Sequence, residues 1–366
     1  MGTSVFLGHQ SALEYLCRER YFEASPLGSL GFHLGDCPVA PSARTSRVRS
    51  LGGSCPSDDD IRSLLDGPLR GLSTPVHALV SNPVARSRSR LKVPHAWCIP
   101  PIGGSFAKLA DGLYASSPEL CLVQLARLLT PVELARLAFE LCGTYALSPC
   151  PEDGFRACDP LTATEHVLAF AHRARAAGVR GASALIAALS HVVDGAASPM
   201  ETVVTLLLCL PYRDGGYHLP LPVLNQQPRA TGGGQSVANG ATHRCDLLWP
   251  DAGVTLEYEG EAWHAGTRQA TKDAVRNNVM ASKRRLVFSV TKEQLYDVAQ
   301  FDFIARQIAH ALRKRLYVDD CPYNWFLRRS DLRSTLLPSP GNPLCDERIA
   351  RSGAWVRKDS HAKHAR

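Results

Sequence analysis

One segment constrains the fold of this chain more than any other: residues 245–264, CDLLWPDAGVTLEYEGEAWH. Two runs rich in apolar residues flank PDAG at 250–253, and Pro, Asp and Gly are typical of a tight turn. A turn of these four residues predicts an antiparallel hairpin in which Trp249 pairs with Val254. Counting outward along both strands then places Asp246 directly opposite Glu257.

The predicted hairpin brings acidic side chains together. Residues paired directly on antiparallel strands project from the same face, and Glu259 shares the face of Glu257 because strand side chains alternate. Carboxylates as close as Asp246, Glu257 and Glu259 repel one another unless a cation lies between them. Hard oxygen ligands favour Mg²⁺ or Mn²⁺, and such a metal activates water for attack on a phosphodiester. The sequence therefore predicts a metal site.

Neighbouring residues are open to two interpretations. His264 follows the second strand and could orient or deprotonate the attacking water, or protonate the leaving oxygen; a half-buried structural histidine is the alternative. Glu201 is the third residue after the helix-start residue Ser198, so capping accounts for it. Taken singly, Asp246 could be a turn residue and Glu257 or Glu259 part of a solvated strand face. The joint arrangement is what favours a functional site.

The rest of the chain divides into regions by composition. Residues 1–115 are rich in Ser, Gly, Pro and Arg, and ARSRSRLK at 85–92 is either a solvated loop or an arm that contacts phosphate. Residues 116–195 have the start signals of a helical middle domain, at Ser117, at Thr130 with Glu133, and at Thr162 with Glu165. The helix from Thr130 is expected to end at Gly143 in a left-handed conformation, and residues 182–193 predict another helix. For both regions we expect an α+β organisation.

Residues 198–318 predict an α/β domain. A capped helix after Ser198, the hairpin, a helix near 269–283, a strand at 286–290 and a long helix follow one another. The long helix is indicated by apolar residues four apart, at Ile304, Ile308, Leu312 and Leu316. The polar, basic tail at 339–366 is expected to be disordered.

Composition excludes several classes of protein. The 366 residues contain no apolar run of the ~20 residues that span a membrane. The amino terminus lacks the pattern of a signal peptide, so we expect a cytoplasmic protein. The cysteines form no C-x-x-C pair, which argues against a zinc ribbon. The net charge of +7 is compatible with a polyanionic partner without requiring one.

The polar residues of the hairpin region resemble a known family. The order of Asp246, Leu256-Glu257-Tyr258-Glu259-Gly260, His264, Asp273, Arg276, Val290-Thr291 and Gln294-Leu295 is similar to that in small endonuclease-like domains related to the very short patch repair endonucleases. Those domains belong to the PD-(D/E)XK restriction-endonuclease-like superfamily. The resemblance covers about residues 198–316 and implies a mixed sheet flanked by helices, with Mg²⁺-dependent hydrolysis of DNA. The preceding region resembles bacterial proteins with an N-terminal half similar to the abortive-infection antitoxins of type IV toxin–antitoxin systems.

The resemblance implies roles for individual residues. Asp246 and Glu257 correspond to the metal ligands, with Glu201 as a third, and His264 corresponds to the active-site histidine. Asp273 and Arg276 match a polar pair on the following helix, where an internal ion pair is the alternative. Contacts to nucleic acid would come from basic residues that a solvated helix end explains equally well: Lys272, Lys283, Arg284 and Arg285.

One departure from the family bears on catalysis. The superfamily's lysine after the second acidic residue is absent, and Glu259 stands there, where the related domains usually have Asp. The group that activates water is therefore left open. We predict a metal-dependent endonuclease acting on DNA in defence, repair or a toxin–antitoxin system. The alternative is a non-catalytic DNA-binding regulator or antitoxin, whose partner would be DNA, a toxin or a defence protein.

Overall fold

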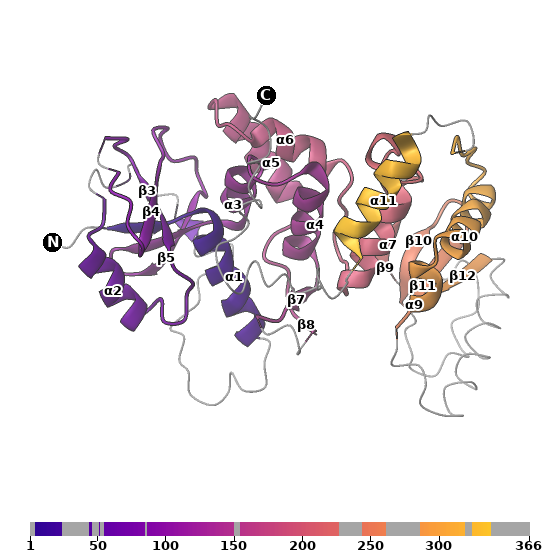
Figure 1. Ribbon diagram of the computed structural model, residues 1–366, viewed down its shortest axis with the longest axis horizontal. Helices are drawn as coiled ribbons and strands as arrows, with labels where there is room; N and C mark the ends of the chain where they lie inside the picture. The colour runs from indigo at the N-terminus through magenta and orange to yellow at the C-terminus, as the bar shows by residue number, and fades with distance from the viewer. Residues whose placement is uncertain are drawn as a thin grey trace, which may run out of the picture. The chain divides into compact units, whose positions relative to one another are not determined.

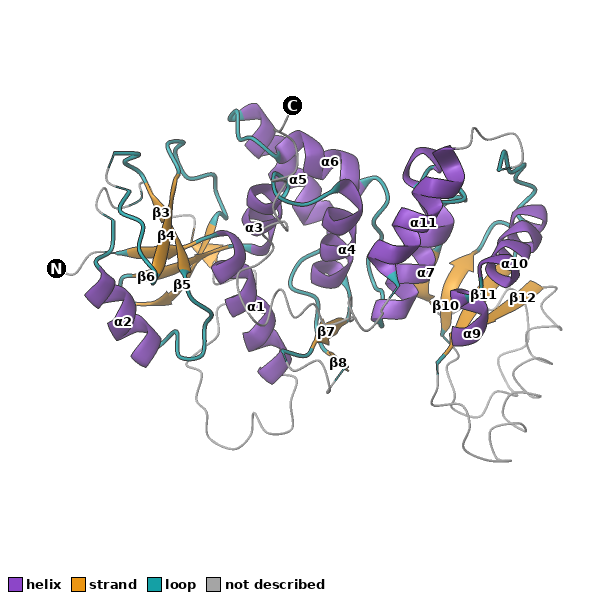
Figure 2. Ribbon diagram, in the orientation of Figure 1, coloured by secondary structure: helices purple, strands orange, loops and turns teal. Residues whose placement is uncertain are grey.

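A computed structural model of the protein describes residues 4–23, 44–45, 51, 55–84, 86–149, 154–226, 244–260, 286–318 and 324–337. The chain forms two compact units. In Figure 1 the colour runs by residue number, so the residues of each unit can be found from the bar. Unit 1 is Met1–Val192 together with Ser339–Arg366, and unit 2 is Val193–Pro338. The predicted tail at 339–366 lies outside the described residues. Each unit combines strands and helices (Figure 2), in keeping with the predicted mixed composition of the two parts.

The core of unit 1 is a six-stranded mixed sheet. Its strand order is β2-β5-β6-β1-β3-β4. The β1–β6 and β3–β4 pairs are parallel, and the other pairs are antiparallel. Helix α1, His9–Glu23, follows β1 and packs against β3, while α2 spans Asp58–Asp66. The strand bounds are β1 Val5–Leu7, β2 Arg44–Thr45, β3 Val76–Val80, β4 Lys92–Ala96, β5 Phe106–Ala110 and β6 Leu113–Ser116.

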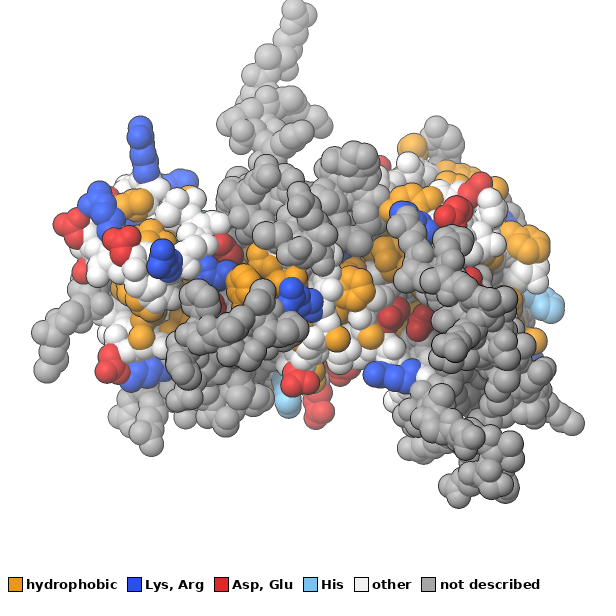
Figure 3. Space-filling view, turned by 90° about the horizontal axis from the view of Figure 1, so that it is seen from below, with side chains coloured by type: hydrophobic (Ala, Val, Ile, Leu, Met, Phe, Trp, Pro, Cys, Tyr) orange, Lys and Arg blue, Asp and Glu red, His pale blue; other side chains and the backbone are white. Residues whose placement is uncertain are grey.

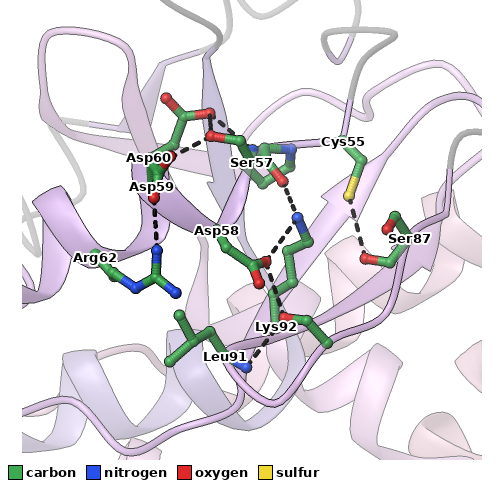
Figure 4. A network of polar contacts seen from close by, with 11 residues as sticks. Cys55, Ser57, Asp58, Asp59, Asp60, Arg62, Ser87, Leu91 and Lys92 are labelled. Atoms are coloured by element: carbon green, nitrogen blue, oxygen red, sulfur yellow. Dashed lines mark hydrogen bonds and ion pairs between the residues drawn. The ribbon is translucent and has the colours of Figure 1, made fainter.

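The arginine-rich loop between β3 and β4 is anchored by a buried lysine. The ammonium group of Lys92 donates to the carbonyl oxygen of Pro56 at 2.5 Å and forms an ion pair with Asp58 Oδ1 at 3.0 Å. The hydroxyl of Ser89 donates to the same carboxylate oxygen at 2.9 Å. Figure 4 shows the side chain of Lys92 reaching Asp58, the first residue of α2. The loop is therefore tied to the unit at Ser89 and Lys92, whereas Arg86, Arg88 and Arg90 are exposed to solvent.

The helices of unit 1 begin largely where the sequence predicts. Ser117 caps α3 by accepting the N–H of Leu120, and Thr130 forms a capping box with Glu133 at the start of α4. These local hydrogen bonds satisfy backbone donors that have no partner within the helix. The remaining bounds are α3 Pro118–Leu125, α4 Pro131–Cys142, β7 Tyr145–Leu147, β8 Phe155–Ala157, α5 Thr164–Ala176 and α6 Ala182–Leu189.

Three local predictions in unit 1 are wrong. Gly143 ends α4 in extended backbone, with φ −83° and ψ 174°, rather than in the left-handed region. Thr162 does not cap a helix, because its hydroxyl donates to the buried carboxylate of Glu119 at 2.5 Å and α5 starts two residues later. Helix α6 ends at Leu189 instead of continuing to Val193.

Unit 2 is built on a four-stranded mixed sheet of order β12-β11-β10-β9. The β9–β10 and β10–β11 pairs are antiparallel, and β11 pairs with β12 in parallel. Helix α7 packs against β10 and β11, while α10 packs against β12, which gives the predicted α/β character. The bounds are α7 Pro199–Cys209, η4 Tyr212–Asp214, β9 Val223–Gln226, β10 Cys245–Trp249, β11 Val254–Glu259, β12 Leu286–Thr291, α9 Lys292–Tyr296, α10 Val298–Ala311 and α11 Asn324–Leu336.

The carboxyl-terminal helices of unit 2 differ from the prediction in extent. Ile304 and Ile308 are buried on α10 as expected, but the helix ends at Ala311, so Leu316 lies beyond it. Helix α11 was not predicted. Its Arg329 pairs with Asp302 on α10 at 3.1 Å, which fastens the two helices together. None of the helices in the described part of the chain is long and apolar enough to cross a membrane.

The hairpin at β10–β11 has the predicted register. Trp249 pairs with Val254, and the next residues outward pair in turn. Gly253 closes the turn at φ +64°, and its N–H donates to the Pro250 carbonyl at 3.2 Å. The Gly253 carbonyl accepts the N–H of Leu286, the first residue of β12, at 2.9 Å. This glycine therefore sets both the hairpin and the start of the parallel strand.

Replacing Gly253 with alanine should destabilise unit 2 by about 1 kcal/mol, because a side chain at positive φ is strained. Chemical denaturation of the full chain should report the loss. Gly260→Ala is the matched control just after the same strand, since among the described residues its new Cβ would meet only the Tyr258 ring, at 3.8 Å. Equal losses in the two variants would contradict a special role for Gly253.

Candidate functional site

A row of polar residues crosses the sheet of unit 2. Asp246 lies between the pairs Cys245↔Gln226 and Leu247↔Leu224, so it stands opposite Asn225 of β9. Continuing the β10–β11 register by one residue places it opposite Glu257 as well, and Glu257 pairs with Ser289 of β12. The polar row therefore consists of one residue from each strand: Asn225, Asp246, Glu257 and Ser289.

Glu201 of α7 is linked to the polar row through Asn225. The hydroxyl of Ser198 accepts the N–H of Glu201 at 3.2 Å, so the predicted cap at the start of α7 is present. Glu201 Oε2 accepts the N–H of Ala197 at 2.8 Å and the side-chain amide of Asn225 at 2.5 Å. The Glu201 residue is only 6% exposed. Glu201 thus accepts a hydrogen bond at the start of α7 and also contacts Asn225 of β9.

The charge on Glu201 is disfavoured by its surroundings. Burial raises the pKa of the Glu201 carboxyl above its ordinary value of 4.5, and the hydrogen bond from Ala197 opposes this shift in part. The negative charge of Asp246 raises the pKa of Glu201 further, while Asn225 lowers it. Glu201 and Asp246 are therefore close enough to interact as like charges in a buried setting.

The other carboxylates of the hairpin differ in exposure. Asp246 is half-buried, and its Oδ2 accepts the backbone N–H of Tyr258 at 2.8 Å. Glu257 is 6% exposed. Glu259 pairs with Thr291 of β12 and is half-buried, two residues beyond Glu257 on the same face. Asp246, Glu257 and Glu259 form what we call the acidic row, which extends from the buried Glu257 to the more open end of β11.

The carboxylates of the hairpin could supply oxygen ligands to a metal ion. The part of the chain that the structure describes contains no group of three or more His, Cys, Asp or Glu side chains that could hold a metal ion. Mg²⁺ commonly uses only one or two protein carboxylates, with phosphate and water supplying its other oxygen ligands. Asp246 and Glu257 fit that smaller requirement, because they are hard oxygen donors on directly paired strands.

The remaining predicted site residues fall in the connection between β11 and β12. Residues 261–285 lie outside the described residues, so the structure does not place the predicted histidine, polar pair or basic residues. These are His264, Lys272, Asp273, Arg276, Lys283, Arg284 and Arg285.

The sequence analysis did not predict two members of the polar row, Asn225 and Ser289. Asn225 has a positive φ of 52° and follows a proline-rich stretch with no periodic pattern, so no local signal marks it. Ser289 could have been found, because it is the polar residue inside the otherwise apolar strand LVFSV. Pairing that strand in parallel with β11 brings Ser289 beside Glu257.

Comparison with known proteins returns no relative. No protein-family model, curated protein or solved structure matches this chain. The resemblance to very short patch repair endonucleases therefore stays a prediction.

Substitutions of Glu201 should separate its hydrogen bonding from its charge. Glu201→Ala leaves the Ala197 N–H and the Asn225 amide without their acceptor, and we expect a loss of about 1–3 kcal/mol. Glu201→Gln retains an oxygen that can accept both bonds and removes the charge, so it should be tolerated at neutral pH. Urea denaturation of both variants measures the difference, and equal losses would mean that the hydrogen bonds contribute little.

The same Glu201→Gln variant should change the pH dependence of stability. Because the folded-state pKa of Glu201 is raised, its protonated form stabilises the fold fully below the unfolded pKa, and this contribution is lost as the pH rises through the folded pKa. Wild type should therefore lose stability relative to Glu201→Gln as the pH rises from about 4 toward neutrality. Free energies of unfolding across this range test it; a constant difference would contradict the shift.

Proposed function

We propose that unit 2 is a metal-dependent endonuclease that hydrolyses phosphodiester bonds of DNA. The observation that carries the proposal is the acidic row, in which Asp246 lies opposite Glu257 and interacts with the buried Glu201. Gathering like charges beneath a helix lowers the stability of a fold. Carboxyl groups with perturbed pKa values concentrate at functional sites, which supports a catalytic use of this cluster.

The architecture of unit 2 also supports the proposal. A mixed sheet flanked by helices is what the resemblance to restriction-endonuclease-like domains implies, and unit 2 has a mixed four-stranded sheet packed with α7 and α10. The acidic residues lie on adjacent strands of that sheet. Paired strands hold functional side chains in fixed relative positions, as a catalytic site requires.

The residues of unit 2 divide the chemistry between them. Bound Mg²⁺ or Mn²⁺ would polarise a phosphodiester oxygen and lower the pKa of a water molecule. Asp246 and Glu257 would hold the ion, and Tyr258 orients Asp246 through the hydrogen bond from its backbone N–H. Asn225 orients Glu201 through the hydrogen bond that its side-chain amide donates. Glu259, at the more open end of β11, would accept the proton of the attacking water.

The charge of the whole chain is compatible with DNA as a partner but does not single out one binding face. The net charge of +7 favours association with a polyanion. On the face seen in Figure 3, the described Lys and Arg side chains lie among acidic and apolar ones rather than in one continuous patch. A cytoplasmic role in defence, repair or a toxin–antitoxin system fits such an enzyme.

A second function is favoured by two observations. Asp246 and Glu201 both accept hydrogen bonds from within the protein, and Glu259 stands in place of the superfamily's lysine. A degenerate nuclease fold that binds DNA without cutting it would keep these contacts for stability alone. The alternative is therefore a DNA-binding regulator or antitoxin.

Cleavage of supercoiled plasmid with Mg²⁺ or Mn²⁺ tests the proposal. Asp246→Asn and Glu257→Gln each remove a metal-binding charge at little change in size. We expect each to reduce nicking by more than the ~10–100-fold typical of losing a residue that only orients a ligand. Asp251→Asn, in the exposed turn of the same hairpin, is the matched control and should cut normally.

The two functions differ in their response to chelation. The enzyme should lose all cleavage in EDTA and recover it when the metal is restored. If the plasmid stays intact with every metal while DNA binding is unchanged by EDTA, the regulator is supported and the endonuclease is wrong.

A further inference from the structure

Three histidines of unit 1, distant in sequence, lie against one another. His9 begins α1, and His77 and His95 belong to the parallel strands β3 and β4. The rings of His9 and His95 stack with centroids 3.8 Å apart, and those of His77 and His95 stack at 5.0 Å. His77 Nδ1 and His95 Nε2 are 2.8 Å apart, within hydrogen-bond distance. We call these residues the histidine cluster.

The first turn of α1 is fixed beside β3 by several hydrogen bonds. Gly8 links β1 to the helix, and its N–H donates to the His77 carbonyl at 2.9 Å. The His77 N–H donates to the hydroxyl of Ser11 at 2.9 Å, and the His9 N–H donates to Gln124 Oε1 at 2.7 Å. His9 itself has φ +52°, a left-handed conformation that strains a residue other than glycine. The fold therefore holds His9 in place against a local preference.

The charged groups that act on the pKa values of the histidine cluster are positive. Burial is the main reason that the pKa of His9 lies well below its ordinary value, and His95, His77 and Arg127 lower it further. Burial also lowers the pKa of His77 and of His95 to about 4, with Arg88 acting on both and Arg86 on His95. Every group that shifts these pKa values electrostatically is thus an arginine or another histidine.

This environment is suited to an anion rather than a metal ion. Nearby guanidinium groups repel a cation, and the described residues contain no three-ligand metal group. The first turn of α1 lies at the positive end of the helix dipole, and its backbone N–H groups have no partner within the helix, although that of His9 already donates to Gln124. In addition, His9 Nδ1 is buried and has no hydrogen-bond partner among the described residues. Hydrogen-bond donors and positive charge at a helix start are the usual recognition elements for phosphate.

We propose that the histidine cluster, the first turn of α1 and the side chains of Arg86, Arg88 and Arg127 form a binding site for a phosphate group. Arg86 and Arg88 lie on the loop whose far end is fastened through Ser89 and Lys92 (Figure 4). The phosphate belongs either to a small molecule such as a nucleotide or to a nucleic-acid backbone. The site lies in unit 1 and does not depend on the function proposed for unit 2.

Phosphate binding at this site should be coupled to protonation. The imidazoles are neutral at neutral pH, and an anion beside them favours their protonated forms. Binding therefore takes up protons and becomes tighter as the pH falls toward the pKa values of the histidines. A site made only of arginines would bind phosphate without this proton uptake.

Isothermal titration of the full chain tests the site with inorganic phosphate, adenosine monophosphate and a short DNA duplex as separate probes. Titrations at about pH 5.5 and about pH 7.5, in buffers of different ionisation enthalpy, measure the proton uptake once the second ionisation of the phosphate probes, with a pKa of about 6, is subtracted. We expect Arg88→Gln to weaken binding about tenfold, the effect of losing one charged hydrogen bond. Arg90→Gln is the matched control, because it is exposed on the same loop but acts on none of the three rings.

The three probes distinguish the source of the phosphate. Arg88-dependent binding of phosphate and the nucleotide supports a small-molecule site, and Arg88-dependent binding of the duplex alone supports a backbone contact. The absence of binding by all three probes would overturn the proposal, as would equal weakening by Arg90→Gln or the lack of proton uptake. Loss of plasmid cleavage in Asp246→Asn with phosphate binding intact would show that the two sites are separate.

Discussion

The turn between β10 and β11 is the constraint on which the rest of unit 2 depends. Gly253 adopts a left-handed conformation that closes the turn and leaves Trp249 opposite Val254. Because side chains alternate along a strand, a slip of one residue would move Asp246 and its neighbours to the other face of the sheet. The carbonyl of Gly253 also accepts a hydrogen bond from the N–H of Leu286, the first residue of β12. One turn therefore fixes the register of the hairpin and the point at which the parallel strand joins it.

In the proposed site, Glu201 would combine the structural role that its hydrogen bonds give it with a functional one. Its backbone N–H donates a hydrogen bond to the hydroxyl of Ser198. Its Oε2 accepts hydrogen bonds from the backbone N–H of Ala197 and from the side-chain amide of Asn225. These bonds favour the carboxylate, whereas burial and Asp246 favour the protonated carboxyl. Helix capping alone does not require a second acid nearby, so capping explains the position of Glu201 but leaves the proximity of Asp246 unexplained. The opposing effects of hydrogen bonding and burial on the pKa of Glu201 are what single out this residue as part of the candidate site.

Sequence reasoning succeeded where the signal was local and failed where a distant residue decided the outcome. Ser117, Thr130 and Ser198 cap helices as predicted, because each bond spans only three residues. Thr162 has the same local pattern, but the buried Glu119, 43 residues away, takes its hydroxyl. The six-stranded sheet of unit 1 went largely unpredicted for the same reason, since its strand order joins segments far apart in sequence. Asn225 became part of the site only through its register with Asp246.

The two candidate sites follow from one electrostatic rule applied to opposite signs. In unit 2, burial and the charge of Asp246 raise the pKa of Glu201, and a cation between the two carboxyl groups would relieve their repulsion. In unit 1, arginines act on buried neutral imidazoles, and an anion among them would relieve the opposite imbalance. His9, His77 and His95 carry no shared spacing in the sequence, and each alone would pass for an ordinary core histidine. What distinguishes them is the charge of their neighbours, which a sequence motif does not record and which the fold assembles from separate elements.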